Sequence, residues 1–471
     1  MEARGMASAS AFDDDIDVQQ GRLTVRNEDA LRTAKMDALV RQAVFGEGQG
    51  KDHAQWMIWE TAQAVGVRPA SIHDLYAARG RGDVKGFTVP AFNVRGMSYD
   101  TARAIFRTAV RMHAGAFILE IARSEIAYTG QRPSEYVTVM LAAALREGFR
   151  GPVFIQGDHF QVNAKKFAAD PTGEVAAVKQ LAIEAVSAGF YNIDVDTSTL
   201  VDISLSSLDA QQERNYETAA EIAAYVRSIE PAGVTISIGG EIGEVGTQNS
   251  TVPELRAFME GFVKSLEKRA PGAVGLSKIS VQTGTSHGGI VLPDGGIADV
   301  KLDLEALEQL SKVAREEFGM SGAVQHGAST LPESAFDNFP RIETAEIHLA
   351  TNFQNILFEH MPSELRGRIY QWLDENAKDE RKKGDSDEQF YYKSRKKALG
   401  PFKRDLWDLP VDVKESFAKA YDRTFSFLFE QLRIGGTSDA VTRFVKAPVQ
   451  RRRISGSVAV EAAPDDPDAG E

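Results

Sequence analysis

The chain has 471 residues, 43% hydrophobic and 26% charged, with a formal net charge of −13. This length exceeds what one hydrophobic core usually organises, so we expect a core domain with additions. The acidic balance argues against a general binder of nucleic acid or anionic membrane, because such proteins need a basic field. The chain has no cysteine, which excludes disulfides, thiolate catalysis and zinc–thiolate sites. Any metal must therefore bind His, Asp, Glu or carbonyl oxygen.

The N-terminal region is predicted to lie outside the core domain. Residues 1–27 are polar and acidic and are predicted to be a disordered N-terminus. Helical periodicity in Glu28–Val44 and Asp52–Val65 predicts a helical N-terminal extension over residues 28–85. No apolar window is long enough to cross a bilayer, and no signal peptide is recognised at the start. We therefore expect a cytoplasmic protein without a membrane partner.

The central region alternates short apolar runs with helical segments, and each run fits a strand buried on both faces. The runs are Thr88–Val94, Ala116–Ala122, Pro152–Gly157, Tyr191–Val195, Val234–Gly239, Leu276–Gln282, Ala323–Gln325 and Thr344–Ala350. Eight such alternations predict an α/β fold, a TIM (β/α)8 barrel over residues 86–360 with N-terminal and C-terminal helical extensions. A doubly wound open sheet is the alternative, disfavoured because no glycine-rich dinucleotide fingerprint follows an early strand.

The region after the barrel is predicted to be a helical C-terminal extension over residues 361–449, followed by a disordered tail over 450–471. Arg366–Asp374 and Val411–Leu432 have amphipathic helical periodicity. The charged segment Tyr391–Lys397 between them is interpreted as a solvated surface or a subunit contact. A basic arm that reaches a phosphate is the alternative interpretation of this segment.

Chemistry in such a barrel belongs at the C-terminal ends of the strands. The chain has eight histidines, and four of them lie at these ends: His159, His287, His326 and His348. One such histidine alone would more often be a packed core residue. Histidines from separate strands that meet carboxylates at one barrel mouth favour a metal site instead. We predict that His159, His287 and His326 hold zinc, which accepts three protein ligands and an open fourth position.

The open position predicts the type of reaction. A metal there acts as a Lewis acid and stabilises charge that develops on a carbonyl oxygen. Asp158, next to His159, is the candidate proton carrier, and a turn or helix cap is its alternative role. Gly288-Gly289 and Gly327–Ser329 follow two of the histidines, and such small residues let backbone N–H groups approach a phosphate.

At these residues the sequence resembles the class II fructose-bisphosphate/tagatose-bisphosphate aldolase family, from about Gly86 to about Gln354. The resemblance implies an active-site asparagine, a proton-transfer aspartate, metal ligands, and phosphate and monovalent-cation loops. These correspond in turn to Asn93; to Asp158; to His159, His287 and His326, with Asp196 and Glu241 as an alternative metal position; and to Gly288, Gly327 and Ser329.

The sequence also departs from the family pattern. The loop Gly246–Ser250 has no carboxylate where the family carries a catalytic glutamate, and Asn249 stands near that place. Ala122 replaces a phosphate-contacting serine. In the eighth strand, His348 replaces a substrate-binding asparagine. His348 is a metal-site residue, a substrate contact or a core group, with a substrate contact favoured, and Thr351 is a further candidate contact.

The resemblance implies a reversible, zinc-dependent or other divalent-metal-dependent aldol cleavage. Its substrate is a ketose (bis)phosphate such as fructose 1,6-bisphosphate, and its products are a three-carbon ketose phosphate and an aldehyde. The family habit also implies a homo-oligomer. A non-catalytic, assembly-promoting subunit is the alternative, favoured by the missing loop glutamate. A Schiff-base aldolase at Lys278 is the third hypothesis, disfavoured because Lys278 lies several residues before the strand end.

Overall fold

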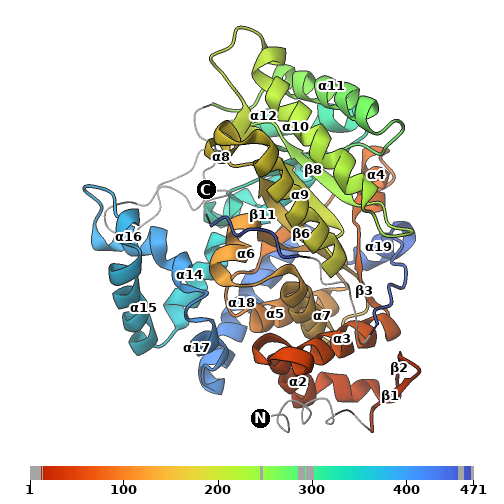
Figure 1. Ribbon diagram of the computed structural model, residues 1–471, viewed down its shortest axis with the longest axis vertical. Helices are drawn as coiled ribbons and strands as arrows, with labels where there is room; N and C mark the ends of the chain where they lie inside the picture. The colour runs from red at the N-terminus through yellow and green to blue at the C-terminus, as the bar shows by residue number, and fades with distance from the viewer. Residues whose placement is uncertain are drawn as a thin grey trace.

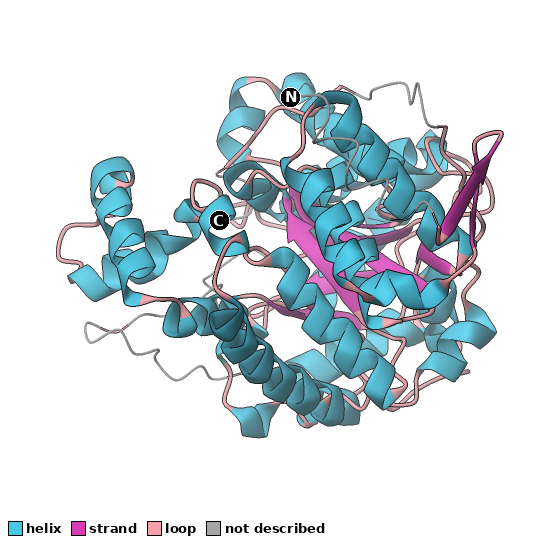
Figure 2. Ribbon diagram, turned by 90° about the horizontal axis from the view of Figure 1, so that it is seen from below, coloured by secondary structure: helices cyan, strands magenta, loops and turns pink. Residues whose placement is uncertain are grey.

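The computed structural model describes residues 12, 14–243, 248–284, 292, 302–453 and 461–467. Its centre is a closed barrel of eight parallel strands, β4 to β11, in which the pairing of β6 with β7 closes the ring. The strands are β4 (Val89–Asn93), β5 (Ile118–Ala122), β6 (Gly151–Gln161), β7 (Asn192–Asp196), β8 (Ser237–Glu241), β9 (Lys278–Val281), β10 (Ala323–Gln325) and β11 (Glu346–Leu349). Helices surround the strands (Figure 2). The predicted TIM barrel is confirmed.

Each of these strands overlaps a predicted apolar run, because strands of a parallel barrel are buried on both faces and read as continuous apolar segments. Strand β6 is the exception in length. It continues to Gln161, past the predicted end at Gly157, and its extra residues carry the site described below.

Helices follow the barrel strands in chain order. They are α5 (Ser98–Met112), α6 (Arg123–Thr129), α7 (Pro133–Glu147), α8 (Ala164–Ala169), α9 (Pro171–Ala188), α10 (Leu208–Ser228), α11 (Val252–Arg269), α12 (Leu304–Glu316) and α13 (Asn338–Arg341). Helix α11 shows how the sequence defines a helix start. The Thr251 side chain accepts from the Glu254 N–H, the Glu254 side chain returns to the Thr251 N–H, and Pro253 lies in the first turn. This capping box satisfies backbone donors that a helix end leaves open.

The prediction of a disordered N-terminus was wrong for residues 16–25. Strands β1 (Ile16–Gln19) and β2 (Arg22–Val25) form an antiparallel hairpin. Gln20 and Gly21 form its turn with φ of 52° and 76°, the left-handed conformation that two-residue hairpin turns need. Leu23 is fully buried, so the hairpin is anchored by apolar packing that its acidic composition conceals.

The N-terminal extension packs directly on the barrel. Helices α2 (Ala34–Phe45) and α3 (Gly48–Ala64) lie against α7. Strand β3 (Val67–Ala70) then adds to the start of β6 in parallel register, and α4 (His73–Gly80) leads into the barrel. The extension is therefore helical except for this strand and the hairpin.

The C-terminal extension contains α14 (Thr351–His360), α15 (Ser363–Asn376), α16 (Asp387–Ser394), α17 (Lys403–Trp407), α18 (Val411–Gln431) and α19 (Ser438–Phe444). Helix α18 packs against α5 and α14 and covers the seam between the first and last barrel strands. The Phe92 ring of β4 lies 5.2 Å from Phe425 and 5.9 Å from Phe429 of this helix. In Figure 1, α15, α16 and α17 lie to one side of the barrel.

The basic segment Tyr391–Lys397 forms the end of α16 and the turn after it. Lys393 lies 2.9 Å from Asp385, and Lys397 pairs with Glu380. Both lysine charges therefore have carboxylate partners from the same extension, which favours the surface interpretation of this segment over a phosphate-reaching arm.

The prediction of a disordered tail was wrong for residues 450–453 and 461–467. The indole N–H groups of Trp56 and Trp59 donate to the carbonyl oxygens of Arg452 and Gln450, at 2.9 Å and 2.6 Å. The Arg452 guanidinium stacks over the Trp59 ring. Further along, Asp466 is buried against Arg123. Partners far away in sequence order this polar segment. No helix in the described part of the chain is both long and apolar enough for a membrane span.

Candidate active site

Polar side chains from five strands converge at the C-terminal end of the barrel. Asp158 and His159 come from β6, Asp196 from β7, Glu241 from β8, His326 from the end of β10, and His348 from β11. All are buried except Glu241, which is partly exposed. Barrel enzymes place their reacting groups at this end. The structure therefore brings together six of the predicted site residues.

A β-bulge in β6 turns two adjacent residues toward the same site. Gly157 is paired with Ile193 and Phe160 with Val195, so Asp158 and His159 together face the single residue Asp194 of β7. His159 has φ of 39°, which is uncommon for a residue with a side chain and is found at functional sites. Adjacent strand residues normally point to opposite faces. The bulge removes this constraint, so that both side chains enter the barrel mouth.

Asp196 orients His159. Its Oδ2 lies 2.9 Å from His159 Nδ1 and accepts from Gln161 Nε2 at 2.6 Å. Its Oδ1 accepts from the backbone and hydroxyl of Ser198 at 3.0 Å and 2.7 Å. Carboxylates that hold one ring nitrogen of a histidine commonly orient the other nitrogen toward a metal. The geometry thus gives Asp196 an orienting role beside the predicted role as a ligand.

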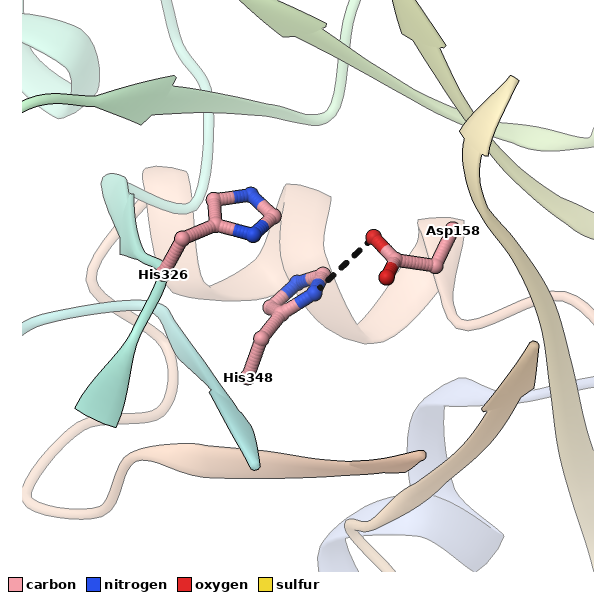
Figure 3. A group of neighbouring side chains, drawn as sticks. All are labelled: Asp158, His326 and His348. Atoms are coloured by element: carbon pink, nitrogen blue, oxygen red, sulfur yellow. Dashed lines mark ion pairs between the residues drawn. The ribbon is translucent and has the colours of Figure 1, made fainter. Parts of the chain in front are cut away.

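His326 and His348 lie side by side and point toward Asp158 (Figure 3). The two imidazole centroids are 4.1 Å apart, and His326 is 4.4 Å from the His159 ring. His348 Nδ1 is 3.2 Å from Asp158 Oδ1, and its Nε2 is 2.7 Å from Glu346 Oε1. His326 Nε2 is 3.0 Å from the Ser280 hydroxyl.

A network of buried charges supports this site from below. Lys278 Nζ lies 2.5 Å from Glu346 Oε1, 2.9 Å from Asp194 Oδ1 and 2.7 Å from Gln156 Oε1. Gln156 Nε2 donates to Glu120 Oε2 at 2.9 Å. Buried charges are tolerated only when they are paired and hydrogen-bonded. The network therefore holds Glu346, and through it His348, in one position.

The electrostatics of the site favour separated charges in the metal-free protein. Burial raises the pKa of Asp158, but the neighbouring His159 and His348 outweigh burial and lower it well below its usual range. Burial lowers the pKa of His348, but the Glu120 and Asp158 carboxylates raise it well above its usual range. Burial and the Asp196 charge raise the pKa of Glu241 to about 8. A cation that enters must displace protons from these groups.

The residues fit a divalent metal. Two groups at the mouth have one donor atom from each member within 4.8 Å of the others: His159, Glu241 and His326, and Asp158, His326 and His348. Imidazole nitrogen and carboxylate oxygen are ligands that zinc accepts. Asp158 Oδ1 and His348 Nδ1 are buried and make no hydrogen bond to any described residue. Such atoms indicate a missing partner.

The other predicted contacts occupy different positions. Asn93 Nδ2 donates to Glu125 at 2.7 Å, and its Oδ1 accepts from Arg95 at 2.9 Å. The Ser329 hydroxyl accepts from the Ala350 N–H at 2.5 Å. The turn that carries Ser329 starts at Gly327, whose φ is 68°, and Thr351 begins α14. His287 and Gly288 lie outside the described residues.

Sequence reasoning missed Glu120, Asp194 and Gln156 as parts of the site. All three are buried, and each is a polar residue inside an otherwise apolar strand segment. That pattern was the available signal, because a charge within a strand buried on both faces requires a partner.

Comparison with protein families gives one match: the model described as fructose-bisphosphate aldolase class-II matches residues 80–403. A search of curated proteins finds no match to the sequence.

Solved structures share the fold at low sequence identity. A protein from Sinorhizobium meliloti, described as a probable tagatose 6 phosphate kinase, has 18% identity and a TM-score of 0.53, with 76% of this chain and 98% of that chain covered. A fructose-bisphosphate aldolase from Campylobacter jejuni has 19% identity, a TM-score of 0.46 and coverages of 79% and 97%. A fructuronate-tagaturonate epimerase from Cohnella laeviribosi has 13% identity, a TM-score of 0.48 and coverages of 92% and 90%.

Proposed function

We propose, because the chain belongs to the class II fructose-bisphosphate aldolase family, that it is a metal-dependent aldehyde-lyase that cleaves and forms a carbon–carbon bond in a ketose phosphate. The observation that carries the proposal is the convergence of Asp158, His159, His326 and Glu241 on one end of the barrel. A metal site with an adjacent ionised carboxylate provides the two functions that aldol chemistry needs, charge stabilisation and proton transfer.

The metal is proposed to be zinc or another divalent ion, held by His159, His326 and the undescribed His287, with Glu241 next to them. Bound there, it would supply a Lewis acid that stabilises negative charge on the substrate oxygens during bond cleavage. Asp196 and Gln161 fix the His159 ring by the hydrogen bonds that join them. The bulge keeps Asp158 and His159 on the same side of β6.

Asp158 is proposed to transfer the proton. In the cleavage direction, a base removes the proton from the hydroxyl group next to the breaking bond, and the electron pair of that bond moves toward the carbonyl. The lowered pKa of Asp158, to which His159 and His348 contribute against burial, keeps this carboxylate ionised at neutral pH. An ionised carboxylate can accept a proton, and its position beside the histidines limits the distance the proton must travel.

The proposed substrate is a phosphorylated sugar, with Gly327, Ser329, Thr351, Asn93 and the undescribed Gly288 as its contacts. Gly327 and Ser329 lie at the end of β10, where barrels commonly bind phosphate. The absence of a carboxylate at Asn249 separates this chain from the family pattern. Asn249 instead donates to Asp303 at 3.1 Å. The specific sugar is therefore an experimental question.

The test measures metal content and fructose 1,6-bisphosphate cleavage on one preparation, with and without EDTA, beside His159→Ala and the exposed-site control His53→Ala. About one divalent ion per chain with EDTA-sensitive cleavage is expected, and His159→Ala should lose both. Bound metal without cleavage would redirect the search to other ketose phosphates. Absence of metal, with His159→Ala like the wild type, would overturn the proposal in favour of a non-catalytic, assembly-promoting subunit.

A further inference from the structure

We infer that His348 binds the divalent ion through Nδ1, in a position formed together with Asp158 and His326. This residue stands where the sequence resemblance implies a substrate-binding asparagine. The inference rests on the proposed function for the presence of a metal, and it assigns His348 to the metal rather than to the substrate.

The first support is the spacing of two atoms. Asp158 Oδ1 and His348 Nδ1 are 3.2 Å apart, both are buried, and neither makes a hydrogen bond to a described residue. Two ligands at ~2.0–2.1 Å from one tetrahedral ion lie about 3.3 Å from each other. The two atoms therefore already have the separation of ligands that share an ion.

The second support is the orientation of the His348 ring. Its Nε2 lies 2.7 Å from Glu346 Oε1, and Glu346 is itself held by Lys278 at 2.5 Å and by the Tyr76 hydroxyl. Metal-binding histidines commonly donate their second ring N–H to a carboxylate in this way. With the proton on Nε2, the Nδ1 lone pair points toward Asp158.

His326 completes this position. One of its ring nitrogens lies within 4.8 Å of the donor atoms of Asp158 and His348, and the two imidazole rings are 4.1 Å apart. His326 also belongs to the group with His159 and Glu241. The two positions share this histidine, so His348 extends one metal centre and does not form a separate one.

Two neighbouring carboxylates are poorer partners for His348 Nδ1. Glu120 Oε2 is also 3.2 Å from Nδ1, but it accepts from Gln156 Nε2 at 2.9 Å. Glu120, Glu346 and His348 form a third group of donor atoms. In that group the Lys278 ammonium lies 2.5 Å from Glu346 Oε1, so a positive charge already neutralises the carboxylates. The unbonded oxygen of Asp158 has no such competitor among the described residues.

The experiment titrates the chelator-stripped full chain with Zn²⁺ by calorimetry and with Co²⁺ by visible absorption. The variants are His348→Asn, which introduces the family's residue, and Glu346→Gln, which removes the orienting charge. His360→Asn is the matched control, because His360 is exposed and contacts only Ser416 in the printed geometry of the described residues. Thermal unfolding of each metal-free variant reports whether it is folded.

His348→Asn is expected to weaken Zn²⁺ binding at least tenfold and to change the Co²⁺ spectrum, while His360→Asn changes neither. Glu346→Gln should weaken Zn²⁺ binding about 10–100-fold, the range for carboxylates that orient metal ligands. It keeps the side-chain shape and serves as the test if His348→Asn does not fold. Wild-type Zn²⁺ affinity and an unchanged Co²⁺ spectrum in both variants would overturn the inference. A wild-type chain that binds no metal would instead overturn the proposed function.

Discussion

Lys278 Nζ lies 2.9 Å from Asp194 Oδ1, and both side chains are buried inside the barrel. Burial lowers the pKa of Lys278, but the Asp194 and Glu346 carboxylates outweigh it and raise the pKa above its usual value. A Schiff-base lysine needs the opposite shift, because only the neutral amine attacks a carbonyl. The pairing therefore counts against the Schiff-base hypothesis and makes Lys278 a structural cation.

Lys278→Met is expected to destabilise the protein by about 3–5 kcal/mol, because it leaves Asp194 and Glu346 without their buried counter-charge. Urea unfolding measures the loss. Lys264→Met is the matched control, since Lys264 is exposed on α11, and it should change stability by less than ~0.5 kcal/mol. Borohydride in the presence of substrate should give no adduct on the wild type. A trapped adduct at Lys278 would contradict this assignment.

Metal binding is expected to release protons and to weaken as the pH falls. The carboxylates around His159 and His348 raise the pKa of each histidine above its usual value, against the effect of burial. Below those raised values the histidines are protonated, so the ion must displace protons, and a lower pH favours the protonated state. Calorimetry at pH 8, 7 and 6, in buffers of different ionisation enthalpy, gives the affinity and the number of protons released. An affinity that does not change across this range would contradict the expectation.

Asp158→Asn is expected to lower kcat by ~10²–10⁴-fold, the usual contribution of a positioned proton-transfer group. The amide keeps the shape of the side chain but cannot accept the substrate proton. Steady-state cleavage assays in excess divalent metal measure this effect separately from metal occupancy. Asp303→Asn, a change outside the barrel mouth at the N-cap of α12, is the control. A loss in Asp158→Asn of less than tenfold would assign the proton transfer to another residue.

The sequence predicted the barrel because each strand repeats one physical requirement, an apolar segment buried on both faces. It also predicted that Asp158, His159 and His326 lie at strand ends. It could not predict the bulge in β6, because the one-residue shift against β7 exists only in the paired strands. The same reason left three roles open for His348. Only the measured separation from Asp158 and the bond to Glu346 distinguish them.

The tail shows a second limit of sequence reasoning. Residues 461–467 are rich in Ala, Pro and Asp, a composition typical of disorder. In the structure Asp466 is buried, with Oδ2 at 3.4 Å from Arg123 Nη2 and 3.0 Å from Lys166 Nζ. Composition measures how much apolar surface a segment can bury by itself, but not whether a distant cation will order it.

The last prediction compares a buried arginine with an exposed one. Arg123 Nη1 lies 2.6 Å from Glu174 Oε1, and both side chains are 3% exposed. Arg123→Met would leave Glu174 and Asp466 buried with one fewer counter-charge, so we expect a loss of about 3–5 kcal/mol. Arg256→Met is the matched control. Its pair with Glu317 has similar geometry at 2.6 Å, but both side chains are 40% or more exposed. Water already solvates these charges, so the control should lose no more than ~1 kcal/mol. Urea unfolding of both variants gives the difference. Equal losses would mean that the tail and α9 do not depend on the Arg123 charge.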